Sequence, residues 1–137
     1  MSTQNKMTVK DVMLGIKNFP VVDKNSILKE TLEKMDFFGY GIACITNNNH
    51  ELLGIITDGD IRRKLLSVQK PLPAFFIDDA INHAIKNPTV TSSSMSLANA
   101  IDLMEQKQVW DLPVVDKGKL IGMLHLHPAV KLSLIHI

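Results

Sequence analysis

Apolar positions along this chain follow two patterns, and each pattern occurs twice. In residues 28–35 the sequence Leu-x-x-Thr-Leu-x-x-Met places apolar side chains three or four positions apart, which predicts an amphipathic helix. Residues 97–104 repeat this pattern as Leu-x-x-Ala-Ile-x-x-Met. Ser26 and Ser96 precede the two segments as candidate N-caps. Met35 and Met104 occupy matching positions, so both are expected in a core.

Short apolar runs follow each predicted helix and predict strands. Residues 41–45 and 112–115 form the first such run of each half, and residues 52–56 and 120–124 form the second. Turn residues separate the runs, and 20–22 and 87–90 open the halves. The order strand, helix, strand, strand, helix therefore occurs twice. We expect an α+β fold of two βαββα units packed about a pseudo-twofold axis, with a cleft for a small ligand between them.

The repeat also predicts the domain boundaries. Residues 1–8 form an N-terminal tail, 9–68 the first unit, 69–76 a linker, 77–131 the second unit and 132–137 a tail. The linker is placed at Lys70-Pro71-Leu72-Pro73, because proline interrupts helices. Short helices over 9–13 and 77–85 are expected to lead into the first and second units.

Composition narrows the class of protein. The chain has 137 residues, 45% of them hydrophobic and 21% charged, which is typical of a soluble globular domain. A net charge of +1 gives no reason to expect nucleic acid or an acidic membrane as a partner. No apolar run is long enough to span a bilayer, and the first residues lack the apolar core of a signal peptide. We therefore expect a cytoplasmic protein in which Cys44, the single cysteine, is a core residue.

The segment 57–63, Thr-Asp-Gly-Asp-Ile-Arg-Arg, carries the candidate chemistry. It follows the apolar run around Gly54 and begins a predicted helix, where unsatisfied backbone N–H groups suit an anion. The Thr57 hydroxyl can contact a phosphate, Asp60 can accept from ribose hydroxyls, and the arginines add positive charge. The same residue types also favour a simple turn and helix cap, so both interpretations stay open.

Apolar residues around 19–21 and 40–42 are expected to form a slot for a base. The predicted ligand-binding residues are Pro20, Val21, Tyr40, Gly41, Thr57, Asp58, Gly59, Asp60, Arg62 and Arg63.

With its doubled βαββα order, Gly54-x-x-Thr57-x-x-Asp60, and Asp11-Val12-Met13 ahead of the first unit, the chain resembles a tandem pair of cystathionine β-synthase (CBS) domains, a Bateman module. More narrowly, residues 57–63 and Gly122-Met-Leu-His-Leu-His127 resemble the C-terminal CBS pair of arabinose 5-phosphate isomerases. The resemblance implies the regulatory part of an enzyme of lipopolysaccharide or capsule precursor synthesis. Similar pairs precede some sugar-phosphate nucleotidyltransferase domains, and a free-standing CBS docking protein is a third alternative.

The resemblance also implies ligands and partners. AMP, ATP or a CMP-linked sugar acid are the candidate ligands, and such modules tend to form homodimers. The partner enzyme domain would be fused or separate. This chain itself shows no catalytic motif, so we expect no enzymatic activity and no cofactor.

The second half departs from the first at its candidate site. Aligning Gly54 with Gly122 places His125 opposite Thr57 and Pro128 opposite Asp60. Proline has no side-chain acceptor for a ribose hydroxyl. We therefore expect one competent nucleotide site per chain, in the first half.

Several polar and aromatic residues have alternative roles. Asp58 and Asp60 could hold Mg²⁺, and His125 and His127 share a strand face and could hold zinc, but both pairs lack further ligands in the sequence. No metal is therefore expected. Trp110 could stack on a base, although packing between helix and strand is favoured. His50 and His83 lie in polar surroundings and are expected to be solvated.

The ends of the chain raise a separate hypothesis. Residues 132–137, Leu-Ser-Leu-Ile-His-Ile, resemble translated sequencing-adapter read-through, with a natural apolar helix end as the alternative. On that hypothesis the authentic protein diverges near Lys131. A catalytic domain on either side would then be absent from this sequence.

Overall fold

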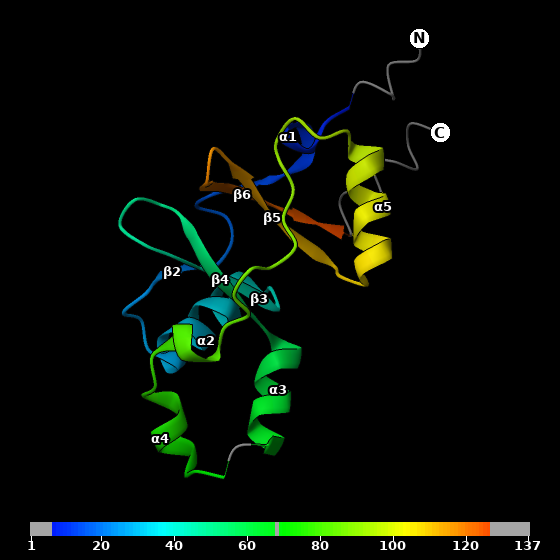
Figure 1. Ribbon diagram of the computed structural model, residues 1–137. Coiled ribbons are helices and arrows are strands. Elements are labelled where there is room, and N and C mark those ends of the chain that lie inside the picture. The colour runs from blue at the N-terminus through cyan, green and yellow to red at the C-terminus, as the bar shows by residue number, and fades with distance from the viewer. Residues whose placement is uncertain (1–6, 68, 127–137) are drawn as a thin grey trace. The chain divides into compact units, whose positions relative to one another are not determined.

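The computed structural model describes residues 7–67 and 69–126, which form two compact units (Figure 1). The central unit comprises Lys17–Pro88. The terminal unit combines the chain up to Ile16 with the chain from Thr89 onward. Each unit has its own sheet and its own buried cluster, so each is described by itself.

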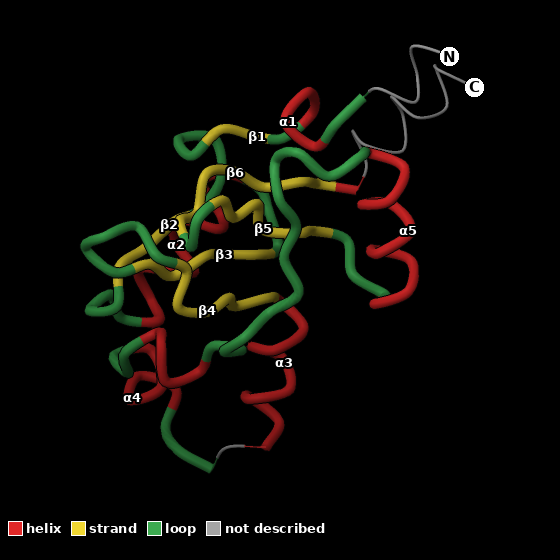
Figure 2. Tube along the Cα trace, turned by 45° about the horizontal axis from the view of Figure 1, so that its top comes forward, coloured by secondary structure: helices red, strands yellow, loops and turns green. Residues whose placement is uncertain are grey.

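The central unit contains a three-stranded sheet in the order β2-β3-β4. Its strands are β2 (Val21–Asp23), β3 (Ile42–Thr46) and β4 (Leu52–Thr57). Its helices are α2 (Leu28–Phe38), α3 (Asp58–Ser67), α4 (Leu72–Phe76) and the 3-10 helix η2 (Ala80–His83). Strand β2 is parallel to β3 and β3 is antiparallel to β4. The traces of the three strands lie side by side in Figure 2.

The central core lies between this sheet and its helices. All five residues of β3 are buried, and Cys44 is inaccessible to solvent. Helix α2 contributes Leu28 and Met35, which are spaced as the sequence pattern requires. Phe75 of α4 completes the cluster. The predicted core roles of Cys44 and Met35 are therefore confirmed.

The terminal unit has a second three-stranded sheet in the order β1-β6-β5. Its elements are α1 (Val9–Val12), β1 (Leu14–Gly15), α5 (Leu97–Lys107), β5 (Asp111–Asp116) and β6 (Lys119–His125). Both pairings are antiparallel. Met104 of α5 is 1% exposed within the core of this unit, as predicted.

The α+β class and the two sheets are thus confirmed. The four main strands of the repeat lie within one residue of their predicted positions, and the two helices begin as predicted but run three residues further, to Phe38 and Lys107. The opening strand expected over 87–90 is reduced to a parallel bridge between Thr91 and Val114. The expected last helix, like Pro128, His127 and the tail 132–137, lies beyond the described residues.

Each segment that leads into a repeat pairs with a strand of the other repeat. Strand β1, which precedes the first repeat, pairs with β6 of the second, and Ile85, which precedes the second repeat, pairs with Ile55 of the first. The Ile55–Ile85 contact uses two backbone hydrogen bonds of 3.0 and 2.8 Å. Backbone pairing of this kind places 77–88 in the central unit and 9–16 in the terminal unit, so the compact units do not coincide with the sequence repeats.

Local predictions around proline and serine need two corrections. The expected linker contains α4, because Pro71 caps this helix and Pro73 lies in its first turn, where a missing N–H costs nothing. Ser96 caps α5 by accepting from the Asn99 N–H at 3.1 Å, as predicted. Ser26 does not cap α2, since its hydroxyl lies 3.4 Å from the Asp23 carboxylate.

Candidate functional site

The register of the central sheet brings most predicted site residues to one edge. Thr57, at the end of β4, lies opposite Ile42 at the start of β3. Val21, the first residue of β2, lies opposite Cys44 of β3. The Asp58 N–H donates to the Gly41 carbonyl at 3.0 Å, which closes the edge between β3 and α3.

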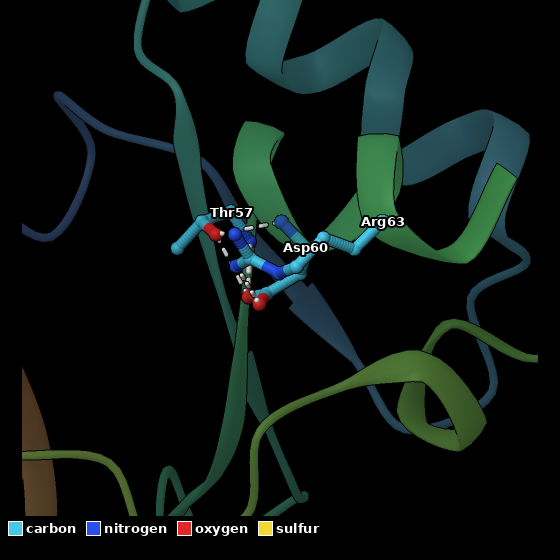
Figure 3. Close-up of polar contacts among 3 residues, drawn as sticks. All are labelled: Thr57, Asp60 and Arg63. Atoms are coloured by element: carbon cyan, nitrogen blue, oxygen red, sulfur yellow. Dashed lines mark hydrogen bonds and ion pairs between the residues drawn. The ribbon is translucent and has the colours of Figure 1, made fainter. Parts of the chain in front are cut away.

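Thr57, Asp60 and Arg63 form one hydrogen-bonded network at the start of α3 (Figure 3). The Thr57 hydroxyl donates to Asp60 Oδ2 at 2.7 Å, and the Asp60 N–H donates back to that hydroxyl at 3.2 Å. The Thr57 N–H also donates to Asp60 Oδ2, at 3.3 Å. This reciprocal arrangement is a capping box, so the cap interpretation of the motif is correct.

Capping does not exhaust what Asp60 can do. Its Oδ1 accepts from Arg63 at 2.8 Å, and its side chain is 13% exposed, whereas that of Arg63 is 64% exposed. A carboxylate offers about four lone-pair sites, so Asp60 retains capacity for a ligand hydroxyl. The network fixes the position of that carboxylate before any ligand arrives.

A pocket of about 240 Å³ opens beside Asp60, and two chain segments form its walls. One wall is α3 and the other is the chain around Ile85, which the pairing with β4 holds beside the helix. The lining residues are Asp60, Arg63, Lys64, Ser67, His83, Ala84 and Ile85. Sequence reasoning missed the second wall entirely. Gly54 was the one sequence feature that pointed to this wall. A Cβ at that position would lie 2.9 Å from the Ile85 carbonyl oxygen, so the close approach of the two segments requires glycine.

The predicted base slot lies at a different pocket, of about 340 Å³. Tyr40, Gly41 and Asp58 line it together with the C-terminal part of α2. The predicted site is therefore divided between two pockets. Arg62 is exposed on α3.

Pro20 and Val21 line neither of these two pockets. The Pro20 carbonyl accepts from the Cys44 N–H at 3.0 Å, and the Val21 carbonyl accepts from Lys34 Nζ at 2.8 Å. Their backbones thus serve the sheet and α2.

His83, expected to be solvated, is a wall residue of the pocket beside Asp60. Its side chain is only 9% exposed, and its ring centroid lies 4.7 Å from that of Phe75. Nε2 lies 2.9 Å from Asp78 Oδ2, which also accepts from Lys70 Nζ at 2.8 Å. Hydrogen bonds from Lys70 and then from His83 lower the pKa of Asp78, so this carboxylate is ionised at neutral pH.

The equivalent edge of the terminal unit carries different chemistry. His125 lies opposite Asp111, as Thr57 lies opposite Ile42, so the predicted alignment of His125 with Thr57 agrees with the strand registers. His125 Nδ1 and Asp111 Oδ1 are 2.7 Å apart. Burial raises the pKa of Asp111, and the hydrogen bond from His125 offsets this only in part.

Trp110 does not pack between helix and strand as favoured. It is 71% exposed, and its carbonyl accepts from the Leu126 N–H at 2.7 Å. It lines a pocket of about 170 Å³ with Met104, Glu105 and neighbouring residues.

Two structural features are absent from residues 7–67 and 69–126. Neither unit contains, within that range, three or more His, Cys, Asp or Glu side chains that could hold a metal ion together. No helix in the same range is both long and apolar enough to cross a membrane.

Comparison with known proteins identifies the family. The CBS domain profile matches residues 9–67 and 77–127, which together are most of the chain. The chain belongs to the CBS domain family. A structure of CBSX2 in complex with AMP superposes with a TM-score of 0.82 at 27% identity, covering 94% of this chain and 97% of that one. The CBS pair is a regulatory module rather than a catalytic domain.

Two curated relatives match almost the whole CBS pair. An uncharacterized protein of Rickettsia prowazekii is 29% identical over 129 residues, covering 94% of this chain and 39% of the relative. The arabinose 5-phosphate isomerase KdsD of Francisella tularensis is 29% identical over 130 residues, covering 93% of this chain and 38% of the isomerase. The chain therefore spans less than two fifths of the length of these relatives.

Proposed function

We propose that this CBS pair senses a nucleotide or nucleotide-sugar, which it binds in the central unit beside Asp60. The observation that carries the proposal is the pocket itself. A pre-positioned carboxylate faces the space that Arg63 and Lys64 also line, so a ribose acceptor and two cationic groups share one cavity. These are complementary to a ribose and a phosphate.

The comparisons support an adenine nucleotide among the candidates. CBSX2, which is similar in sequence and fold, is described in complex with AMP. AMP and ATP are therefore the first ligands to test. A CMP-linked sugar acid is the second class, because it would be an end product of the pathway suggested by the isomerase relatives.

Calorimetric titration of the protein with AMP, ATP and a CMP-sugar tests the proposal. Replacing Asp60 by Ala removes the ribose acceptor and should weaken binding by about 1.5–3 kcal/mol, the range for hydrogen bonds to a charged group. Equal affinity in wild type and Asp60→Ala would exclude the proposed site. Absence of binding by all three ligands would exclude nucleotide sensing by this unit.

Asp60 also caps α3, so a control must separate lost capping from lost binding. Ser96→Ala removes the cap of α5 in the other unit without touching the pocket. This variant should lose a similar amount of stability and retain full affinity. Weakened binding in Ser96→Ala as well would attribute the loss to general destabilisation.

We further propose that the module regulates a sugar-phosphate isomerase of surface-polysaccharide precursor synthesis, as a cytoplasmic homodimer. Similarity to KdsD proteins supports the isomerase, and a ligand can regulate an attached enzyme only if it prefers one of its states. Sequencing the locus tests this directly. An upstream isomerase domain would support the proposal, and a downstream nucleotidyltransferase domain would support that alternative. A locus that encodes neither domain would support a free-standing docking protein.

The chain alone should have no catalytic activity. Its conversion of ribulose 5-phosphate to arabinose 5-phosphate would contradict this. Size-exclusion chromatography with light scattering tests the homodimer.

A further inference from the structure

His83 is the wall residue of the Asp60 pocket whose hydrogen bonding is incomplete. Nε2 contacts Asp78, but Nδ1 has no hydrogen-bond partner among the residues that the structure describes. The side chain is 9% exposed, so bulk water does not replace a partner. Buried polar atoms are nearly always satisfied, so an unsatisfied nitrogen on a residue that lines a pocket calls for an explanation.

Asp78 determines which ring nitrogen of His83 carries the proton. A carboxylate is only an acceptor when ionised, and Lys70 Nζ donates to the same Oδ2 atom. Nε2 must therefore donate its hydrogen to Asp78. In the neutral imidazole this leaves Nδ1 as an acceptor that requires a donor.

The two walls of the pocket are complementary to different parts of a nucleotide, the α3 side to phosphate and the His83 side to the base. Arg63 and Lys64 attract phosphate on the α3 side, and Asp60 accepts from a ribose hydroxyl between them. The Nδ1 lone pair of His83 repels phosphate and carbonyl oxygens. A base whose exocyclic group is an N–H donor is the part of the ligand that suits this wall, where Ala84 and Ile85 add apolar surface.

We infer that His83 is a specificity-determining residue that selects nucleobases with an exocyclic amine, adenine or cytosine, over their oxo counterparts hypoxanthine and uracil. This inference rests on the proposed function, since it assumes that a nucleotide occupies the pocket. Nδ1 is buried, so the ring must turn about its Cβ–Cγ bond to meet the amine. That torsion has a broad minimum. An oxo group would instead place two acceptors face to face.

Paired titrations of the full chain test the inference. In wild type, AMP should bind about tenfold tighter than IMP, and CMP tighter than UMP, as expected for one hydrogen bond gained or lost. His83→Phe retains a ring but no acceptor, so the AMP-to-IMP ratio should fall to within about twofold. His83→Gln can direct its amide N–H to Asp78 and its oxygen to the ligand, and should retain the preference.

A second variant tests the proton assignment without changing His83. In Asp78→Asn the amide can donate to Nε2, which moves the ring proton to Nδ1 and makes that atom a donor. The preference for AMP over IMP should then decrease. His50→Asn changes a histidine in the exposed turn after β3 and should leave every ratio unchanged.

The outcomes separate this inference from the proposed function. AMP binding that depends on Asp60, with the same AMP-to-IMP ratio in wild type, His83→Phe and Asp78→Asn, overturns the inference alone. A wild-type ratio near one also overturns it. Failure of all four nucleotides to bind overturns the proposed function, and the inference with it.

Discussion

The Thr57 hydroxyl and the Asp60 carboxylate hold each other at the start of α3, 2.7 Å apart between Oγ1 and Oδ2. The hydroxyl also accepts from the Asp60 N–H, so the pair satisfies backbone donors of the first helical turn. One interaction therefore both starts the helix and orients the proposed ligand acceptor. Structural and binding roles at this position must be measured separately.

Replacing Thr57 by Ala should lower the free energy of unfolding by about 1 kcal/mol, the usual cost of losing a helix cap. Urea denaturation followed by circular dichroism measures this. Thr57→Ser keeps the hydroxyl and should stay close to wild type. If both variants lose the same stability, the methyl group rather than the hydroxyl is responsible.

Gly54→Ala should destabilise the central unit by about 1–3 kcal/mol, as for an overpacked core. The added Cβ would lie 2.9 Å from the backbone oxygen of Ile85, which cannot move without breaking its pairing with Ile55. Gly41→Ala is the matched comparison. Its new Cβ would meet Asp58 Oδ2, the end of an exposed side chain that can rotate, so the loss should be smaller. Thermal unfolding of both variants decides the order.

Ser93→Ala should be less stable than wild type at neutral pH, with a difference that becomes smaller in acid. Hydrogen bonds from the Ser93 hydroxyl and N–H lower the pKa of Asp116 below its ordinary value of 3.8. A depressed carboxyl pKa stabilises the folded state above the unfolded value, and this contribution is lost as pH falls through the folded value. Denaturation midpoints at about pH 7 and about pH 3 measure it. A difference that stays constant with pH would contradict this account, and Ser94→Ala serves as the exposed control.

Trp110→Ala should change the free energy of unfolding by less than about 0.5 kcal/mol, because the side chain is 71% exposed. Phe75→Ala, in the central core at 2% exposure, should cost about 3–5 kcal/mol. Urea denaturation of the two variants provides the comparison. A large loss for Trp110→Ala would show that its ring packs against apolar surface after all.

Periodicity predicted the repeated helices well, because each of them buries one face of its own. Leu28 and Met35 recur as Leu97 and Met104, and all four are buried. The same reasoning failed for the short segments that precede each repeat. Which sheet a two-residue strand such as β1 joins depends on backbone pairing, and side-chain pattern does not record that choice.

The candidate site was predictable in its polar residues and not in its pocket. Thr57, Asp60 and Arg63 are close in sequence, so helical spacing alone brings them together. His83 and Ile85 reach the same place through a long-range pairing that only the structure reveals. The sequence pattern therefore predicted the Asp60 acceptor but not the segment around Ile85 that faces it.

The exchange of leading segments has a consequence for how such a gene can change. Strand β1 completes the sheet of the later repeat, and Ile85 extends that of the earlier one. A recombination event that copied only one repeat would omit the leading segment that pairs with its sheet. It would include instead the leading segment that pairs with the sheet of the other repeat. A gene segment must therefore encode both repeats for each sheet to be complete, and transfer of a single repeat should be rare.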